Sequence, residues 1–115
     1  MHLKLILVIT SEEKTEAILR AARKVGATGG TIINNVRGQG TTSRRTFFGL
    51  TLEDRRDLLL FLVSAQHARR VLTEVRDAGD FDEKSGTGIA VQLDVEDAVG
   101  LRHQFDSMHE DPEES

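Results

Sequence analysis

The segment Gly26-Ala-Thr-Gly-Gly-Thr-Ile-Ile-Asn-Asn-Val-Arg-Gly-Gln-Gly40 decides the fold, because it joins a helix end, a turn, a strand and a basic loop. Gly26 can adopt the left-handed conformation that ends a helix, and Gly29 with Gly30 permits a tight reversal of the chain. The β-branched residues within 31–36 favour a strand. The segment therefore predicts a helix-to-strand connection.

A glycine-flanked basic loop leaves this predicted strand. Gly38 and Gly40 have no side chains, so their backbone N–H groups can approach a ligand closely, and Arg37 supplies a guanidinium suited to phosphate. The commoner outcome for one isolated G-x-G motif is a glycine turn beside a solvated arginine. Evidence from the rest of the chain is therefore needed to decide whether this segment is a binding loop or a simple turn.

Composition limits the classes of protein that fit. The 115 residues suffice for one domain with one core, and the lack of cysteine excludes disulfides, thiolate metal sites and a cysteine nucleophile. A net charge of -4 and a pI near 5.5 argue against a general nucleic-acid binder. The apolar run 3–9 is too short to span a membrane and precedes no cleavage signal. We expect a cytoplasmic protein.

The chain repeats one pattern of strand, helix and strand. Thr10 and Glu13 form a predicted capping box for the first helix, and Gly26 and Gly79 mark the ends of two helices with equal spacing. Two such units predict a ferredoxin-like α+β fold of order βαββαβ, with both helices on one face of an antiparallel sheet. The expected strands are 3–9, 31–36, 58–63 and 89–95, and the expected helices are 11–26 and 64–79.

Two further segments are polar. Residues 39–57 form a long predicted loop, and loops of this length in compact domains are often functional. Residues 96–101 are expected to form a short helical turn. The domain is expected to cover 1–105, followed by an acidic, disordered tail at 106–115.

The long loop carries residues suited to partner binding. Two arginine pairs, Arg44-Arg45 and Arg55-Arg56, could anchor an acidic partner or could simply be solvated, and the two alternatives are about equal. Phe47 and Phe48 form an aromatic pair in a polar loop, and such pairs usually pack against something, either a partner or the next subunit.

The expected third strand predicts self-association. Residues 58–63 are apolar at every position, so this strand is apolar on both faces, while two helices can cover only one face of the sheet. A second copy of the chain is the simplest cover for the other face, because the C-terminal segment is short and charged.

The duplicated fold, the long loop and the sequence Asp82-Glu-Lys-Ser-Gly-Thr-Gly-Ile-Ala-Val-Gln-Leu-Asp-Val95 together resemble the PII signal-transduction proteins over about residues 3–102. The resemblance implies a non-enzymatic homotrimer that binds an adenine nucleotide (AMP, ADP or ATP) between subunits. It also implies that the loop 39–57 is a T-loop, which docks on a regulated partner such as a membrane transporter or an enzyme.

The resemblance assigns nucleotide-binding positions residue by residue. A threonine on the second strand, a G-x-G motif at the base of the T-loop and a G-x-G motif before the last strand surround the nucleotide in that family, together with a basic residue before the third strand and a C-terminal arginine. The matching residues here, with the neighbouring Arg37, are Thr31, Arg37, Gly38, Gly40, Arg56, Gly86, Thr87, Gly88 and Arg102.

The chain also departs from the family pattern. Ile89 replaces the phosphate-binding lysine after the second G-x-G motif, and Gly100 replaces the first of two C-terminal arginines. ATP should therefore gain little over ADP. One extra residue between Thr31 and Gly38 predicts a bulge. The chain lacks tyrosine, so tyrosyl modification of the T-loop is excluded, and the displaced Gln39 leaves the family's magnesium and 2-oxoglutarate site in question.

Other functional classes fit less well. The sequence shows no catalytic triad and no carboxylate pair beside a glycine-rich pocket, and its four histidines are scattered. An RNA-recognition motif would need more aromatic residues on the third strand than Phe61 alone. The alternative from a different class is a trimeric metal-binding or scaffold protein like CutA, which has the same architecture and binds no nucleotide.

Overall fold

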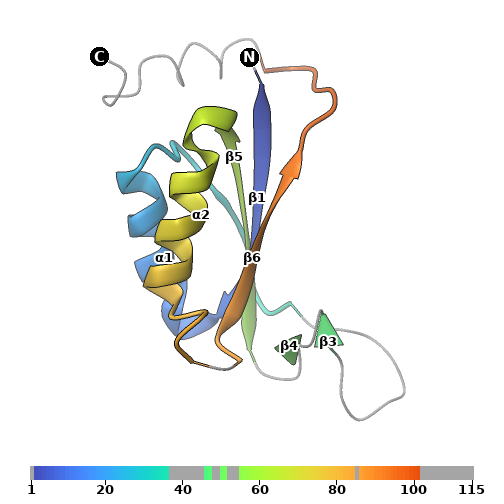
Figure 1. Ribbon diagram of the computed structural model, residues 1–115. Coiled ribbons are helices and arrows are strands. Elements are labelled where there is room, and N and C mark those ends of the chain that lie inside the picture. The colour runs from blue at the N-terminus through green and yellow to red at the C-terminus, as the bar shows by residue number, and fades with distance from the viewer. Residues whose placement is uncertain (1, 37–45, 48–49, 52–54, 85, 102–115) are drawn as a thin grey trace.

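A computed structural model describes residues 2–36, 46–47, 50–51, 55–84 and 86–101 of the chain. The elements follow the order expected for the ferredoxin-like fold, with a short helix and a small hairpin added (Figure 1). Their bounds are β1 (Leu3–Ser11), η1 (Glu12–Lys14), α1 (Thr15–Lys24), β2 (Thr31–Ile33), β3 (Thr46–Phe47), β4 (Leu50–Thr51), β5 (Arg56–Ser64), α2 (Ala65–Gly79) and β6 (Gly88–Asp94).

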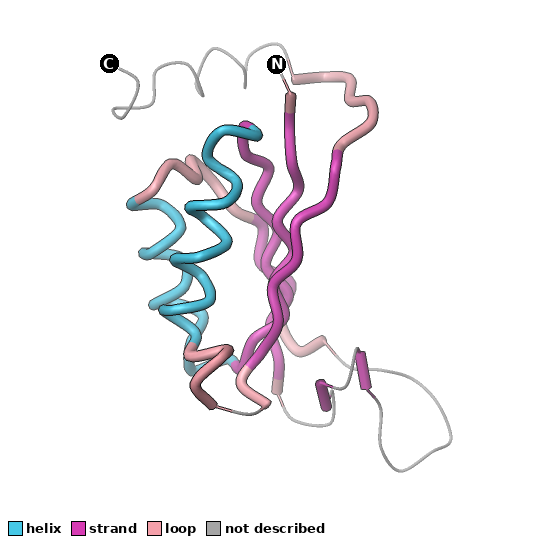
Figure 2. Tube along the Cα trace, in the orientation of Figure 1, coloured by secondary structure: helices cyan, strands magenta, loops and turns pink. Residues whose placement is uncertain are grey.

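The main sheet has four strands in the order β2-β5-β1-β6. Every pair in it is antiparallel, and the central pair is in register over nine positions, from Leu3 opposite Ser64 to Ser11 opposite Arg56. Both helices lie on one side of this sheet, and no helix of the described chain covers the other side (Figure 2). The predicted fold class is confirmed.

The core lies between the sheet and the helices. Alternate residues of β1 and β5 point toward the helices, because successive side chains of a strand lie on opposite faces. They pack against one apolar stripe from each helix. The buried cluster comprises Ile6, Val8, Ile18, Ala22, Val25, Ala27, Leu59, Phe61, Val63, Ala68, Val71 and Val75.

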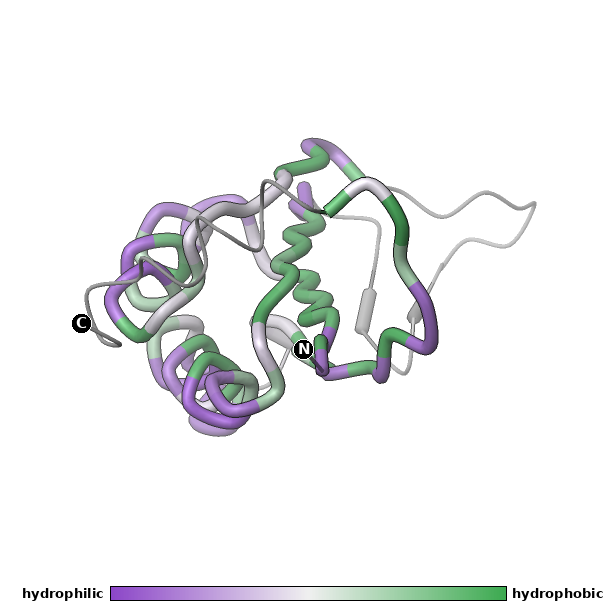
Figure 3. The backbone as a smooth tube through the Cα atoms, turned by 90° about the horizontal axis from the view of Figure 1, so that it is seen from above, coloured by the Kyte–Doolittle hydropathy of each residue, from purple (hydrophilic) through white to green (hydrophobic). Residues whose placement is uncertain are grey.

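The opposite face, which we call the open face, is also apolar. Ile9, Leu7, Leu58 and Ile89 form a small cluster there. Register and alternation place further aliphatic residues beside them, and Ile33 and Leu93 are each 45% exposed. Figure 3, viewed along the strands, shows apolar strand residues with the helices on one side of them. A strand apolar on both faces was predicted and is observed.

The predicted capping box of Thr10 and Glu13 is wrong, because the first helix does not begin there. Thr10 belongs to β1, where its Oγ1 atom is fully buried without a hydrogen-bond partner. The chain instead makes the single 3-10 turn η1, and neither Ser11 nor Lys14 caps a helix through its side chain. The strand extends two residues further than expected because β5 pairs with Thr10 and Ser11 and β6 pairs with Thr10.

The second strand is shorter than predicted. β2 ends at Ile33, and Asn35 adopts a positive φ of 57°. If the register continued, Val36 would face Arg55, but its N–H donates to the carbonyl oxygen of Arg56 at 2.8 Å. This hydrogen bond is one residue out of the register of β2, and the bulge expected from the extra residue stays a prediction.

Several bounds and glycine roles differ from the sequence predictions. β5 begins at Arg56, which shortens the expected loop, and residues 96–101 form no helical turn. Neither Gly29 nor Gly30 has a positive φ; a Cβ on Gly30 would instead lie 2.7 Å from the Phe61 ring, so close packing explains that glycine. The expected domain boundary at 105 lies outside the described residues. Among the described residues, no helix is long and apolar enough to cross a membrane.

Candidate functional site

The second G-x-G motif forms the connection into β6. Gly86 has a φ of 78°, and a Cβ there would meet no atom within 4 Å, so its backbone conformation accounts for the glycine. Gly88 is the first residue of β6, and a Cβ there would lie 2.5 Å from the carbonyl oxygen of Ile9 and 2.5 Å from the Phe81 ring. Close packing alone therefore explains why this position is a glycine, without a ligand.

Thr87, which lies between these glycines, is held by hydrogen bonds of its side-chain hydroxyl and of its backbone carbonyl. Its hydroxyl lies 3.0 Å from the carbonyl oxygen of Asp80 and 3.1 Å from that of Lys84. Its own carbonyl oxygen accepts the N–H of Ser11 at 3.1 Å and Nη1 of Arg56 at 3.2 Å. The loop is therefore fixed to α2, β1 and β5.

Arg56 joins this loop to the base of the segment between β2 and β5, which we call the arm. Only 5% of the residue is exposed, and strand alternation places its side chain on the open face. Besides donating to Thr87, it accepts the N–H of Val36 through its backbone carbonyl. The two ends of the arm, residues 36 and 56, are thus hydrogen-bonded to each other and to the loop before β6.

The next residue ties the arm base to the first helix. Asp57 points to the helix face, and its Oδ2 accepts the hydroxyl of Thr15 at 2.6 Å in a buried hydrogen bond. Because both groups are shielded from water, either one would be costly to leave unpaired.

An ion pair completes the connections at this end of the sheet. Lys14 Nζ donates to Asp80 Oδ2 at 2.7 Å. This hydrogen bond holds the pKa of the Asp80 carboxyl below its ordinary value and raises the pKa of Lys14. We call the six connected residues the arm-base network: Lys14, Thr15, Arg56, Asp57, Asp80 and Thr87.

Thr31 lies on the other edge of the sheet. It is exposed on β2, whereas Gly88 begins β6, and β5 and β1 lie between these two strands. Three strand spacings amount to about 14 Å. One chain therefore brings Arg56 and Thr87 together, but it does not bring Thr31 to the loop 86–88.

One other predicted residue lies in a described strand. Phe47 belongs to β3, which pairs with β4 as Thr46 with Thr51 and Phe47 with Leu50. The other predicted arm and C-terminal residues lie outside the described residues; they are Arg37, Gly38, Gly40, Arg44, Arg45, Phe48 and Arg102.

A hollow of about 320 Å³ lies between α2 and the free edge of β6. Gly88 lines it together with Arg69, Arg76 and Asp82, among others. Arg76 forms ion pairs with Asp77 at 3.0 Å and Asp82 at 3.6 Å, and it is therefore engaged within the chain.

Sequence reasoning missed most of the arm-base network. Lys14, Thr15, Asp57 and Asp80 belong to different elements, and no short spacing links them. The available signal was Asp57 itself, a carboxylate directly before an apolar strand, because buried carboxylates need partners.

The sequence matches a known protein family. The family model described as nitrogen regulatory protein P-II matches residues 3–104. A search of curated protein sequences found no match.

Two solved structures share the architecture. A protein of Thermus thermophilus described as PII-like and signalling is 23% identical, with a TM-score of 0.60 over 83% of this chain and 87% of that one. CPII of Thiomonas intermedia, bound to ADP, AMP and acetate, is 18% identical, with a TM-score of 0.63 over 82% of this chain and 86% of that one. With the family model covering nearly the whole chain, this protein belongs to the nitrogen regulatory protein P-II family.

Proposed function

We propose that this chain is a cytoplasmic, non-enzymatic signalling module that binds an adenine nucleotide between the subunits of a homotrimer and controls a partner through the arm that joins β2 to β5. Family membership supports the signalling role. A nucleotide is supported by CPII, a structural relative that carries ADP and AMP.

The observation that carries the proposal is the separation of Thr31 from Gly86, Thr87 and Gly88. These residues lie at opposite edges of one sheet, with two strands between them. We infer that a site using both takes Thr31 from one subunit and the loop from another, in an assembly that places edge β2 of one copy beside edge β6 of the next.

The open face supplies a reason to assemble. Its side chains on β1, β2, β5 and β6 are almost all aliphatic, and contiguous apolar surface of this kind marks an interaction site. A closed ring of copies offers each such face a partner surface. Arg56 lies at one end of this face, and the other residues on it include Leu5, Leu7, Ile9, Thr31, Ile33, Leu58, Leu60, Leu62, Ile89, Val91 and Leu93.

The described cations suggest which nucleotide is favoured. Arg56 already donates to Thr87, and Ile89 packs with Ile9, Leu7 and Leu58 at a position where the family resemblance implies a lysine. A third phosphate would therefore meet no additional cation among these residues. We expect ADP and AMP to be the effective ligands, with little gain for ATP.

Light scattering and calorimetry test the proposal together. The expected mass is three times the 12.7 kDa of one chain, and each chain should bind one ADP or AMP, because a closed trimer has as many clefts as subunits. A monomer, or a trimer that binds divalent metals and no nucleotide, would refute it. The second of these results would favour the CutA-like alternative.

A further inference from the structure

Charge is unevenly distributed along the chain. Residues 102–115 contain Arg102 and five acidic residues, which are Asp106, Glu110, Asp111, Glu113 and Glu114, and this balance equals the net charge of -4 of the whole protein. Residues 1–101 are therefore electrically neutral overall. Any strongly basic area on the described part of the chain must be offset by acidic residues elsewhere on it.

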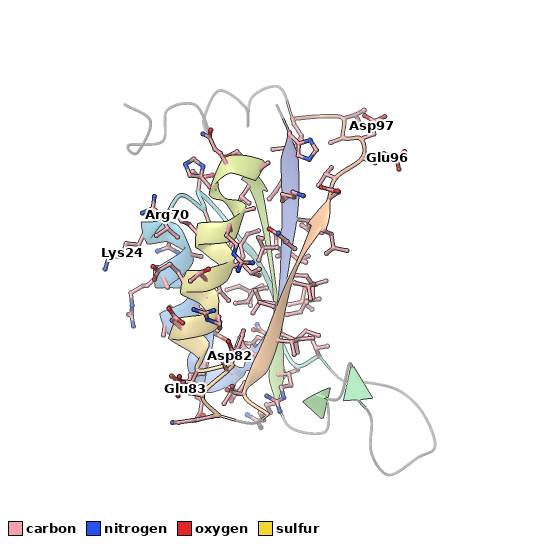
Figure 4. The ribbon with its side chains drawn as sticks, in the orientation of Figure 1. Lys24, Arg70, Asp82, Glu83, Glu96 and Asp97 are labelled. Carbon is pink, nitrogen blue, oxygen red and sulfur yellow. The ribbon has the colours of Figure 1, made fainter. Side chains whose placement is uncertain are left out.

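Such an area lies where α1 ends and α2 begins. Arg20, Arg23 and Lys24 follow helical spacing on α1 and are all exposed, and Arg70 is exposed on the second turn of α2. Lys24 and Arg70 project from the same end of the helix layer (Figure 4). We call these four residues the basic helix end.

Three residues of the basic helix end line a hollow with one acidic residue in it. Arg20, Arg23, Lys24 and Glu74 line a depression of about 610 Å³ between the helices. Glu74 offsets one of the three positive charges of the lining. The depression therefore keeps a positive balance and has room for an acidic peptide segment.

The opposite end of the helix layer carries acidic residues. Asp82 and Glu83 are exposed where α2 ends, and Figure 4 shows them far from Lys24 and Arg70. Glu12 and Glu13, which directly precede Lys14 and the start of α1, are also exposed. Asp82 pairs with Arg76 at 3.6 Å, Glu12 pairs with Arg55 at 3.8 Å, and Lys84 is exposed nearby, so this end is mixed in charge and attracts an acidic segment less than the basic helix end does.

The described chain ends at the end of the sheet where α2 begins. Val95 donates its N–H to the carbonyl oxygen of Leu3, and Ala65 donates to that of His2, so the end of β6 lies where β1 and α2 begin. Residues 96–101 continue at this same end of the sheet (Figure 1). The 14 residues that follow can extend over about 46 Å, whereas α2 is about 22 Å long. Length therefore does not restrict where they bind.

We propose that the acidic segment 106–115 binds the basic helix end of its own chain. Being tethered, it has a high local concentration at this surface, so several weak exposed ion pairs can together hold it there. The bound segment would exclude other acidic peptides from α1 and α2. The surface is distinct from the open face and from the arm-base network.

A spin label tests this directly, because the chain has no cysteine. A nitroxide on Ser115→Cys should reduce the amide signals of residues 20–24 and 70 in the full-length protein. The loss should disappear in 1 M salt, where the Debye length falls to about 3 Å. It should also disappear when Glu113→Gln and Glu114→Gln neutralise the tail. Uniform signal loss, or loss confined to the opposite end of the helix layer or the open face, would overturn the proposal.

Charge reversal provides the matched control. Arg23→Glu with Lys24→Glu should abolish the loss, because these side chains are exposed and can change without disturbing the core. Lys84→Glu, an exposed cation at the other end of α2, should leave it unchanged. Equal effects of the two changes would contradict the assigned surface. Chains without a nitroxide can also be mixed with nitroxide-bearing chains. Signal loss in the unlabelled chains would show that the tail binds another copy, and would contradict the proposal that it binds its own chain.

Discussion

Arg56 Nη1 donates a hydrogen bond to the carbonyl oxygen of Thr87 at 3.2 Å, which ties the first residue of β5 to the loop before β6. The same residue accepts the N–H of Val36, at the other end of the arm. A change in the loop 86–88 therefore has a direct path to both ends of the arm. In a signalling protein, this is the path along which a bound ligand could alter the arm.

Arg56→Gln should destabilise the protein. The guanidinium is buried, and a hydrogen bond to a charged group contributes about 1.5–3 kcal/mol, so we expect a loss in the free energy of unfolding of that order. Urea denaturation measures it. The control is Arg55→Gln, whose side chain is 71% exposed and 3.8 Å from Glu12, and which should change stability by less than about 0.5 kcal/mol. Equal effects at both positions would show that the bond to Thr87 is unimportant.

Gly88→Ala should be destabilising through overpacking. Its Cβ would lie 2.5 Å from a backbone oxygen, which cannot rotate away, and overpacking typically costs about 1–3 kcal/mol. Gly29→Ala is the matched control, because its Cβ meets nothing within 4 Å and its φ is not positive. That change should be neutral or stabilising by about 0.4–1 kcal/mol. Thermal unfolding distinguishes the two, and an unaffected Gly88→Ala variant would rule out the close packing.

Thr15→Val should leave the buried Asp57 carboxylate without its hydroxyl donor. The shape of the side chain is kept, so the expected loss of about 1.5–3 kcal/mol reflects the hydrogen bond alone. Thr15→Ser keeps the donor and should recover most of that loss. If valine and serine behaved alike in denaturation, the hydroxyl would have no role.

The Lys14–Asp80 pair should make stability depend on pH. The lowered pKa of Asp80 contributes stability above the ordinary value of 3.8, and this contribution is lost as the pH falls through the still lower pKa of the folded state. The raised pKa of Lys14 contributes stability below 10.5 that is lost at higher pH. Lys14→Met should therefore be less stable than the parent at neutral pH, with the difference shrinking in acid.

A double-mutant cycle with Asp80→Asn isolates this pair. Asn tolerates the left-handed φ of 58° that Asp80 adopts, so the backbone should be unchanged. Additive effects of the two single changes at neutral pH would show that the side chains are not coupled.

The sequence predicted the fold well where a local pattern was sufficient. Apolar runs and helical spacing located β1, β5, α1, α2 and β6 to within a few residues. It failed where distant pairing decided the outcome: Thr10 looked like a helix cap, but pairing with both Asp57 and Gly88 keeps it in β1. β2 ended early because Asn35 took a left-handed conformation, which a run of β-branched residues does not reveal.

The candidate site was predictable only in part, for the same physical reason. The glycines around Thr87 could be recognised locally. That Thr87 contacts Arg56, 31 residues away, could be known only from the folded chain. The separation of Thr31 from this loop likewise follows from strand order, which no local motif contains.

Arg102→Gln tests the proposed phosphate contact. If Arg102 pairs with phosphate, its loss should cost about 1.5–3 kcal/mol of binding, or roughly ten- to a hundredfold in affinity, without changing stability. Calorimetric titration with ADP gives the affinity, and thermal unfolding without nucleotide controls for stability. Unchanged affinity would place the phosphates elsewhere.

Calorimetric titration of the assembled parent protein with AMP, ADP and ATP tests whether the chain binds a nucleotide at all. We expect saturable binding of ADP or AMP at one nucleotide per chain, with ATP within about tenfold of ADP, a difference of about 1.4 kcal/mol. Absence of binding by all three nucleotides, or a preference for ATP by several orders of magnitude, would contradict this expectation.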